Sequence, residues 1–183
     1  MIKVLVTGAY STGKSTLVGA VSASLREAGL IVEVLSDIAR DCPVALNGEQ
    51  TEAATLWLLN TQVAREIEAT QRECEIILCD RGIPDIRAHF EDVETRTKGA
   101  LVPTMAPFLD AWMALYDLIL LSRVDPNCPI EADGLRVADA AFRARLDRYA
   151  AEGLEGHDNV LELPLGLENR LDYTLEAIRR RLS

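Results

Sequence analysis

The stretch Gly8-Ala-Tyr-Ser-Thr-Gly-Lys14-Ser15 decides the fold, because it matches the pattern GxxxxGK[ST]. It follows an apolar run from Ile2 to Val6 and precedes residues with helical spacing, which is the setting that a phosphate-binding loop requires. Glycines let the backbone bend so that consecutive N–H groups point inward, and the next helix adds the positive end of its dipole. The stretch predicts a nucleotide-phosphate site made of Gly8, Ala9, Tyr10, Ser11, Thr12, Gly13, Lys14, Ser15 and Thr16.

Two side chains of this loop are expected to carry its chemistry. Lys14 is placed to bridge the outer phosphates, and Ser15 offers a hydroxyl to Mg²⁺. Thr16 is either a second polar contact or a cap in the first turn of the helix.

Apolar runs and helical spacings alternate along the rest of the chain. Strands are predicted at residues 2–6, 31–35, 75–79, 118–121 and 160–163, and a long helix at 52–72. Shorter helices are predicted around 83–92 and 104–116, then one ending near 153 and one at the C-terminal end. Continuous apolar strands separated by helices favour a parallel sheet covered on both faces. We therefore expect one α/β domain over residues 1–183, with a three-layer P-loop NTPase fold and a five-stranded parallel sheet.

The composition is typical of a compact enzyme with a small substrate. Hydrophobic residues make up 49% of the 183 positions, which is enough for a sizeable core. The formal net charge is −10, so there is no excess of Lys and Arg to neutralise duplex phosphates or an anionic membrane. A nucleic acid or membrane partner is therefore not expected, although average charge leaves room for a local basic groove.

Targeting and metal signals are also absent from the sequence. The chain begins on a predicted strand without a signal segment and contains no apolar run of membrane-spanning length, so a cytoplasmic location is expected. The cysteines and histidines lack metal-site spacing, and we expect reduced thiols and isolated surface or helix histidines. These residues are Cys42, Cys74, Cys79, Cys128, His89 and His157.

Polar candidates gather where the predicted strands end. Asp37, Asp80 and Arg123 each follow a strand, as the loop does, and in parallel sheets ligands bind at that edge. Asp80 could hold Mg²⁺ directly or through water, or it could cap the next turn. Asp85 could complete this group, or it could serve only the dipole of the following helix.

Further candidates lie after the second predicted strand and in the long predicted helix. Arg40 could pair with Asp37, hold an acceptor phosphate or form an ordinary surface salt bridge. Gln62 falls on the apolar stripe of the long helix, where its amide must find a partner, either a nucleobase edge or a backbone carbonyl. Trp57 is a candidate for base stacking or for the core.

The whole chain resembles P-loop kinases of the nucleoside and nucleotide kinase type, and most of all the NadR-type ribosylnicotinamide kinases. The matching pieces are GAYSTGKST, SDIAR, LWLLNTQ, ILCDRGIPD and DGLR. The DRGIPD piece also resembles the DR motif of thymidylate and deoxynucleoside kinases. Similar proteins include phage kinases that phosphorylate hydroxymethylated pyrimidines in DNA, which would need a basic groove.

The resemblance implies roles for particular residues. It implies that Arg81 contacts substrate or phosphoryl groups and that Asp37 takes the proton of the acceptor hydroxyl. It also implies a lid over about residues 123–136, in which Arg123 and Arg136 would contact the transferred phosphoryl group. The alternative for this segment is a connecting loop with solvated arginines.

The sequence as a whole predicts a kinase that uses ATP and Mg²⁺ and acts on a nucleoside, nucleotide or similar small hydroxyl acceptor. The rival hypothesis is an NTPase switch or regulatory module without an acceptor. Two acidic strand ends and a lid favour the kinase, and a GTPase would be expected to show an NKxD-like motif, which the sequence lacks. The oligomeric state stays open and is compatible with a dimer.

Overall fold

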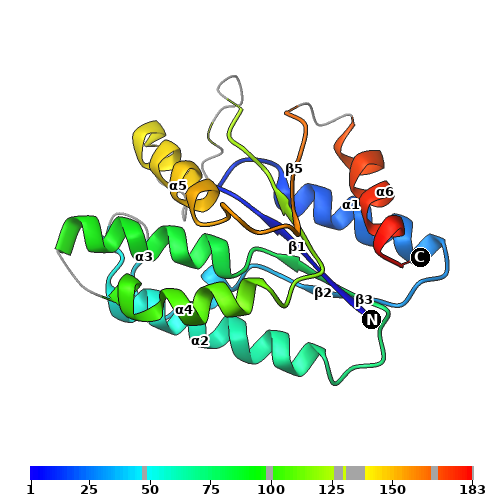
Figure 1. Cartoon of the computed structure of the whole chain (residues 1–183), viewed down its shortest axis with the longest axis horizontal. Coiled ribbons are helices and arrows are strands. Elements are labelled where there is room, and N and C mark those ends of the chain that lie inside the picture. Colours follow the sequence, from blue (N-terminus) through cyan, green and yellow to red (C-terminus); the bar gives the residue numbers. More distant parts are fainter. Residues whose placement is uncertain (47–48, 98–100, 126–129, 131–138, 166–168, 183) are drawn as a thin grey trace.

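Figure 1 shows the computed structural model of the chain, which describes all residues except 47–48, 98–100, 126–129, 131–138, 166–168 and 183. Its centre is a parallel sheet of five described strands in the order β2-β3-β1-β4-β5. The strands are β1 (Ile2–Thr7), β2 (Val32–Leu35), β3 (Ile76–Asp80), β4 (Leu118–Leu121) and β5 (Val160–Glu162). The helices are α1 (Lys14–Glu27), α2 (Glu52–Ala69), α3 (Ile83–Thr97), α4 (Leu101–Met113), α5 (Ala140–Glu152) and α6 (Arg170–Leu182), with a 3-10 helix η1 (Ile38–Asp41).

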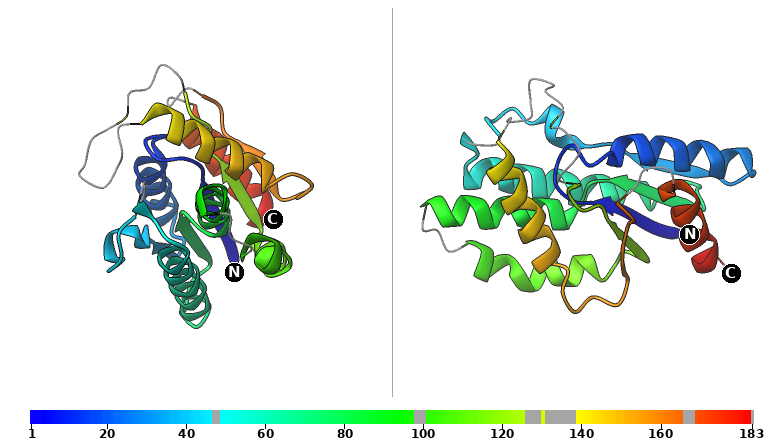
Figure 2. Two further views of the ribbon diagram at one scale, coloured as in Figure 1. Left: turned by 90° about the vertical axis from the view of Figure 1, so that its left-hand side faces the viewer. Right: turned by 90° about the horizontal axis from the view of Figure 1, so that it is seen from above.

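The two faces of the sheet are covered by different helices. Successive residues of β1 point to opposite faces, so Val4 and Val6 join one apolar cluster and Leu5 joins the other. The first cluster includes buried residues of α1 and α6, and the second includes buried residues of α2, α3 and α4. Figure 2 shows the two termini close together, at the end of the sheet away from the loop between β1 and α1.

The structure confirms the predicted α/β fold with its five-stranded parallel sheet, and it corrects several helix bounds. Helix α2 ends at Ala69 rather than at residue 72, because the Thr70 hydroxyl donates to the Ile67 carbonyl at 2.7 Å and competes with the helical bonds. Helix α3 runs on to Thr97, and α4 begins at Leu101 rather than at residue 104. No described helix is long and apolar enough to cross a membrane.

Gly8 lies at a close approach of two strands. Its φ is +129°, and a Cβ at this position would lie 2.2 Å from the carbonyl oxygen of Ser122, which follows β4. A side chain could not fit there without moving β4. The first glycine of the loop is therefore required by the packing of β1 against β4.

Candidate functional site

The predicted phosphate loop leads from β1 directly into α1. Gly13 caps α1 with φ 79°, and Ser11 also has a positive φ of 55°. The Thr12 hydroxyl donates to the Ala9 carbonyl at 3.0 Å, which closes the loop from within. Ser15 and Thr16 in the first turn of α1 are exposed at this edge, and the first N–H groups of a helix have no partner within the helix.

Lys14 is folded over its own loop. Its Nζ donates to the carbonyl oxygens of Gly8 and Ala9, each at 2.6 Å, and only 4% of the residue is exposed. Burial lowers the pKa of Lys14 to about 7, and the positive charge of Arg81 adds to this effect, whereas nearby carboxylates oppose it. The site thus holds a cation that lacks full compensation for its burial.

Asp80 ends β3 beside the start of the loop, since its register partner on β1 is Val6. Its Oδ1 is buried and receives no hydrogen bond from any described residue, while the Ser15 hydroxyl bonds to the carboxyl group. Burial raises the pKa of Asp80, and the Ser15 hydrogen bond and the charges of Arg81 and Lys14 oppose that rise. A buried carboxylate oxygen without a partner, next to a hydroxyl, fits the oxygen chemistry that Mg²⁺ prefers.

A metal held here would draw its remaining ligands from water or phosphate. Among the described residues, no three His, Cys, Asp or Glu side chains cluster as an all-protein metal site. Mg²⁺ is usually held by one or two protein oxygens plus waters and substrate phosphates. Asp80 and Ser15 are the residues that could hold it.

Arg81 joins the acids of two different segments. Its Nε lies 2.8 Å from Asp37 Oδ2, and its Nη1 lies 3.4 Å from Asp85 Oδ1. Burial opposes the charge, but the carboxylates of Asp37 and Asp85 raise the pKa of Arg81 above its ordinary value. Its backbone has φ 74°, an uncommon value for a residue with a side chain. Asp37 also accepts from the Ala39 N–H at 2.9 Å and so caps η1.

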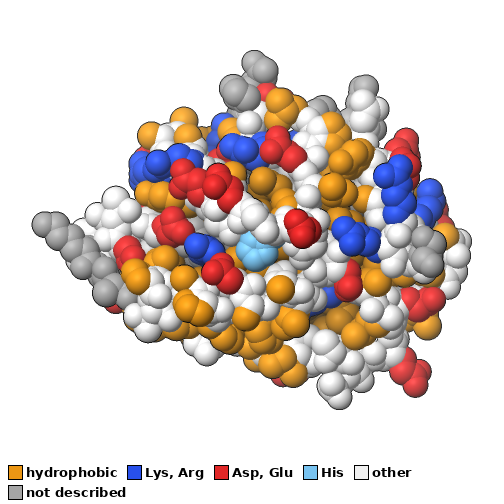
Figure 3. Space-filling model, viewed as in Figure 1, with side chains coloured by type: hydrophobic (Ala, Val, Ile, Leu, Met, Phe, Trp, Pro, Cys, Tyr) orange, Lys and Arg blue, Asp and Glu red, His pale blue; other side chains and the backbone are white. Residues whose placement is uncertain are grey.

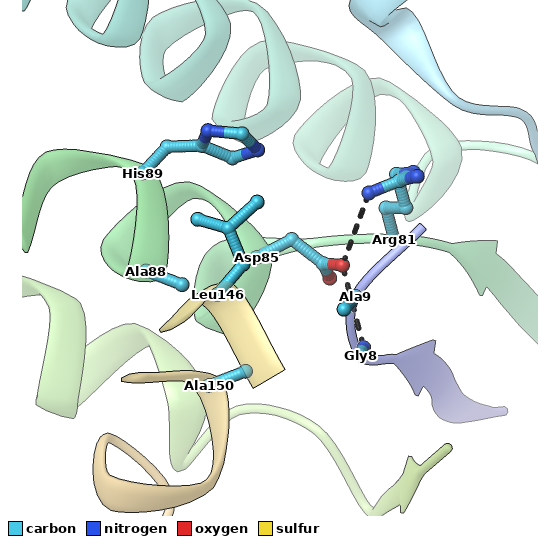
Figure 4. Close-up of a pocket in the computed structure, with 8 residues that line it drawn as sticks. All are labelled: Gly8, Ala9, Arg81, Asp85, Ala88, His89, Leu146 and Ala150. Carbon is cyan, nitrogen blue, oxygen red and sulfur yellow. Dashed lines mark hydrogen bonds and ion pairs between the residues drawn. The ribbon is translucent and has the colours of Figure 1, made fainter. Parts of the chain in front are cut away.

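Asp85 ties α3 to the end of β1. Its Oδ2 accepts from the Thr7 hydroxyl at 2.6 Å and from the Gly82 N–H at 3.1 Å. Its Oδ1 lies 3.4 Å from the Gly8 N–H, and Figure 4 shows this carboxylate between Gly8 and the guanidinium of Arg81. Asp85 therefore bonds the loop itself and does more than serve the dipole of its own helix.

Two hollows meet at these residues. The first, of about 200 Å³ including its open mouth, lies between the loop, α3 and α5, and Figure 4 shows its lining residues. The second, of about 330 Å³, is lined by Asp37, Ile38, Ala39, Leu58, Gln62, Arg81, Gly82, Asp85, Ile86 and His89. Arg81, Asp85 and His89 line both, so the two hollows share one wall.

The remaining predicted residues lie farther from these hollows. Trp57 is partly buried and packs against the core cluster of α2, α3 and α4, and Arg40 is exposed on η1. Arg123 follows β4, where it pairs with Asp147 of α5 at 2.9 Å and with Glu162 of β5 at 3.6 Å. None of the three lines either hollow. Arg136 and most of the predicted lid lie outside the described residues.

His89 is the residue of this site that the sequence analysis missed. It lies on α3, as expected, but it lines both hollows and its ring centroid is 6.2 Å from that of Phe142. Burial, followed by the charge of Arg81, lowers its pKa to about 4, so the ring is neutral at pH 7. The signal that could have found it is its spacing of four residues from Asp85, which places both side chains on one face of a helix.

The comparisons with known proteins concern the family and the fold. A family model described as AAA domain matches residues 3–170. No curated protein gives a significant match.

Two solved structures share the fold. Deoxyadenosine kinase from M. mycoides, with products dCMP and a flexible dCDP bound, has a TM-score of 0.69 at 13% identity, over 98% of this chain and 100% of that chain. NadR protein in complex with NR has a TM-score of 0.69 at 18% identity, over 99% of this chain and 51% of that chain, so this chain spans about half of NadR. Since the family model covers most of the sequence, the chain belongs to the AAA domain family of P-loop proteins, and its fold is that of P-loop kinase structures.

Proposed function

We propose that this protein is an ATP- and Mg²⁺-dependent kinase that transfers a phosphoryl group to a hydroxyl of a nucleoside, nucleotide or related small acceptor. The observation that carries the proposal is the wall shared by the two hollows. One hollow opens on the phosphate loop and the other on η1 and α2, so a donor phosphate and an acceptor can meet across Arg81 and Asp85. Phosphoryl transfer depends mainly on such positioning and on charge stabilisation.

On the donor side, Lys14 would exchange the carbonyls of Gly8 and Ala9 for the outer phosphates of ATP. Phosphate oxygens would supply the negative charge that the buried ammonium lacks. Asp80 and Ser15 would hold Mg²⁺, which neutralises charge on the phosphate oxygens when bound.

On the acceptor side, we assign Asp37 as the general base, because Asp37 lines the second hollow. Arg81 would contact the transferred phosphoryl group, and Asp85 would fix Arg81 against the loop. Gln62 on α2 would form a hydrogen bond with the acceptor. Were the acceptor a phosphate, no base would be needed, and Arg40 would be the residue to bind it.

Two earlier candidates, Trp57 and Arg123, have other partners among the described residues, and a third, Arg136, lies outside them. The packing of Trp57 favours a core role over base stacking. Arg123 can act in a lid only if its pair with Asp147 opens. Arg136 stays a candidate from the sequence alone.

Two alternatives were kept open by the sequence. A nucleotide switch without an acceptor does not need the second hollow, which makes the kinase the better account. A kinase of modified bases in DNA would need a basic track, whereas the net charge is −10 and acidic and basic side chains are mixed on the face shown in Figure 3.

A thermal-shift measurement tests the proposal. A nonhydrolysable ATP analogue with Mg²⁺ at a hundred times its Kd should raise the Tm by about 5–10 °C. Nucleosides, nucleotides and vitamin precursors are then added in turn, and one class should give a second rise that is lost in Gln62→Leu while the rise from the ATP analogue persists. A rise with the analogue but with no member of the panel would favour the switch.

A further inference from the structure

Glu66 on α2 is a buried carboxylate with donors on both oxygens. Its Oε1 accepts from Gln62 Nε2 at 2.9 Å and from the Tyr116 hydroxyl at 2.5 Å. Its Oε2 accepts from Lys3 Nζ and from Trp112 Nε1, each at 2.9 Å. Glu66 is only 1% exposed, and these four side chains are the hydrogen-bond donors to its carboxylate among the described residues.

These contacts fix the orientation of the Gln62 side-chain amide. Gln62 Nε2 faces Glu66 Oε1 and, at 3.4 Å, the carbonyl oxygen of Arg81. A carboxylate and a backbone carbonyl are both acceptors and have no proton to give. The amide must therefore turn its NH₂ group to them, and the orientation follows from chemistry rather than from the similar sizes of oxygen and nitrogen.

The other end of the amide is its oxygen, Oε1. No described residue donates a hydrogen bond to Gln62 Oε1. This oxygen is also not among the fully buried polar atoms that lack a partner in the described part of the chain. Gln62 is 3% exposed and lines the second hollow, so a molecule bound in that hollow is the donor available to this oxygen.

We propose that Glu66 is a positioning residue that holds Gln62 in this orientation, and that the second hollow therefore selects a molecule carrying an N–H donor opposite Gln62. The proposal rests on the kinase function inferred above and defines the substrate class further. The amino groups of adenine and cytosine, or a carboxamide, supply such a donor. An analogue without the donor should bind and react about ten to a hundred times more weakly. Its binding would separate Gln62 Oε1 from water and give this oxygen no hydrogen-bond donor in return.

Replacing Glu66 with Gln should reverse the orientation. The new amide must turn its oxygen to Lys3 and Trp112, which can only donate, so its NH₂ group faces Gln62. Gln62 must then turn its own oxygen to that group and its NH₂ group to the hollow. Glu66→Gln leaves the buried Lys3 without its carboxylate and could prevent folding. The double variant Lys3→Met with Glu66→Gln removes both charges together, and it replaces the single variant in the tests if that variant does not fold.

Hydrogen exchange tests the orientation without any acceptor. In the wild type, the side-chain NH₂ protons of Gln62, followed by NMR of ¹⁵N-labelled protein, should exchange at least about ten times more slowly than in Glu66→Gln. Trp112→Phe is the matched control, since it removes a donor from Glu66 Oε2 and leaves the contacts of Glu66 Oε1 unchanged. Equal exchange rates in the wild type and Glu66→Gln would overturn the orienting role.

Paired acceptors test the selectivity. We would compare adenosine with purine riboside, which lacks the amino group, and cytidine with its 4-deamino analogue, as values of kcat/KM. The amino form should be preferred about ten- to a hundredfold by the wild type and by Trp112→Phe. The preference should vanish or reverse in Glu66→Gln, which a general loss of stability would not cause.

An unchanged ratio of kcat/KM between the amino form and its analogue in Glu66→Gln overturns the proposal. Failure of all four nucleosides to bind or react counts against the nucleoside kinase function, and the exchange rates still decide the role of Glu66.

Discussion

Lys14→Ala is expected to abolish phosphoryl transfer, with kcat/KM reduced by about 10³-fold or more. The ammonium group lies inside the loop within 2.6 Å of the Gly8 and Ala9 carbonyl oxygens, where a phosphate would be surrounded by backbone N–H groups. Water cannot replace a fixed positive charge that bridges the outer phosphates.

Lys14→Met is the matched control for packing. It keeps an aliphatic stem in the buried position and removes only the charge, so we expect the same loss as in Lys14→Ala. Initial rates at saturating acceptor and a thermal melt of each variant separate lost chemistry from lost folding. Wild-type turnover in either variant would contradict the whole account of the loop.

Asp37→Asn should lower turnover by about 10²- to 10⁴-fold, the usual contribution of a positioned base, and leave Mg·ATP binding unchanged. The amide keeps an oxygen for the Ala39 N–H, so the cap of η1 should persist. Asp41→Asn is a control on the same short helix, because its exposed pair with Arg65 should contribute little. Steady-state kinetics and titration with an ATP analogue provide the two readouts.

Asp80→Asn should change the Mg²⁺ dependence of the reaction. Loss of a carboxylate beside Ser15 should raise the Mg²⁺ concentration needed for half-maximal rate. Comparing Mg²⁺ dependence and turnover in the two variants therefore assigns the base and the metal ligand. Normal turnover in Asp37→Asn would exclude its role as the base, and a raised Mg²⁺ requirement in that variant would exchange the two roles.

The sequence predicted the features that depend on short stretches of chain. Five apolar runs became the five strands, and the GxxxxGK[ST] pattern predicted the loop between β1 and α1. The order β2-β3-β1 places the strand of Asp80 next to the strand that leads into the loop.

Contacts between distant segments could not be predicted in the same way. Lys3 is a charged residue in an otherwise apolar strand, and its partner Glu66 is 63 positions away on α2. The pair of Arg81 with Asp37 likewise depends on how the end of β3 lies against the start of η1. His89 gave no signal by itself, because its surroundings come from the loop, α3 and α5 together.

The most direct test of the central claim is transfer of the terminal phosphoryl group of [γ-³²P]ATP in the presence of Mg²⁺ and a nucleoside panel. The account predicts a labelled phosphate ester of one acceptor class, ATP consumption that rises when that acceptor is added, and loss of both in Lys14→Ala. Release of inorganic phosphate at the same rate with every acceptor and without any would contradict it.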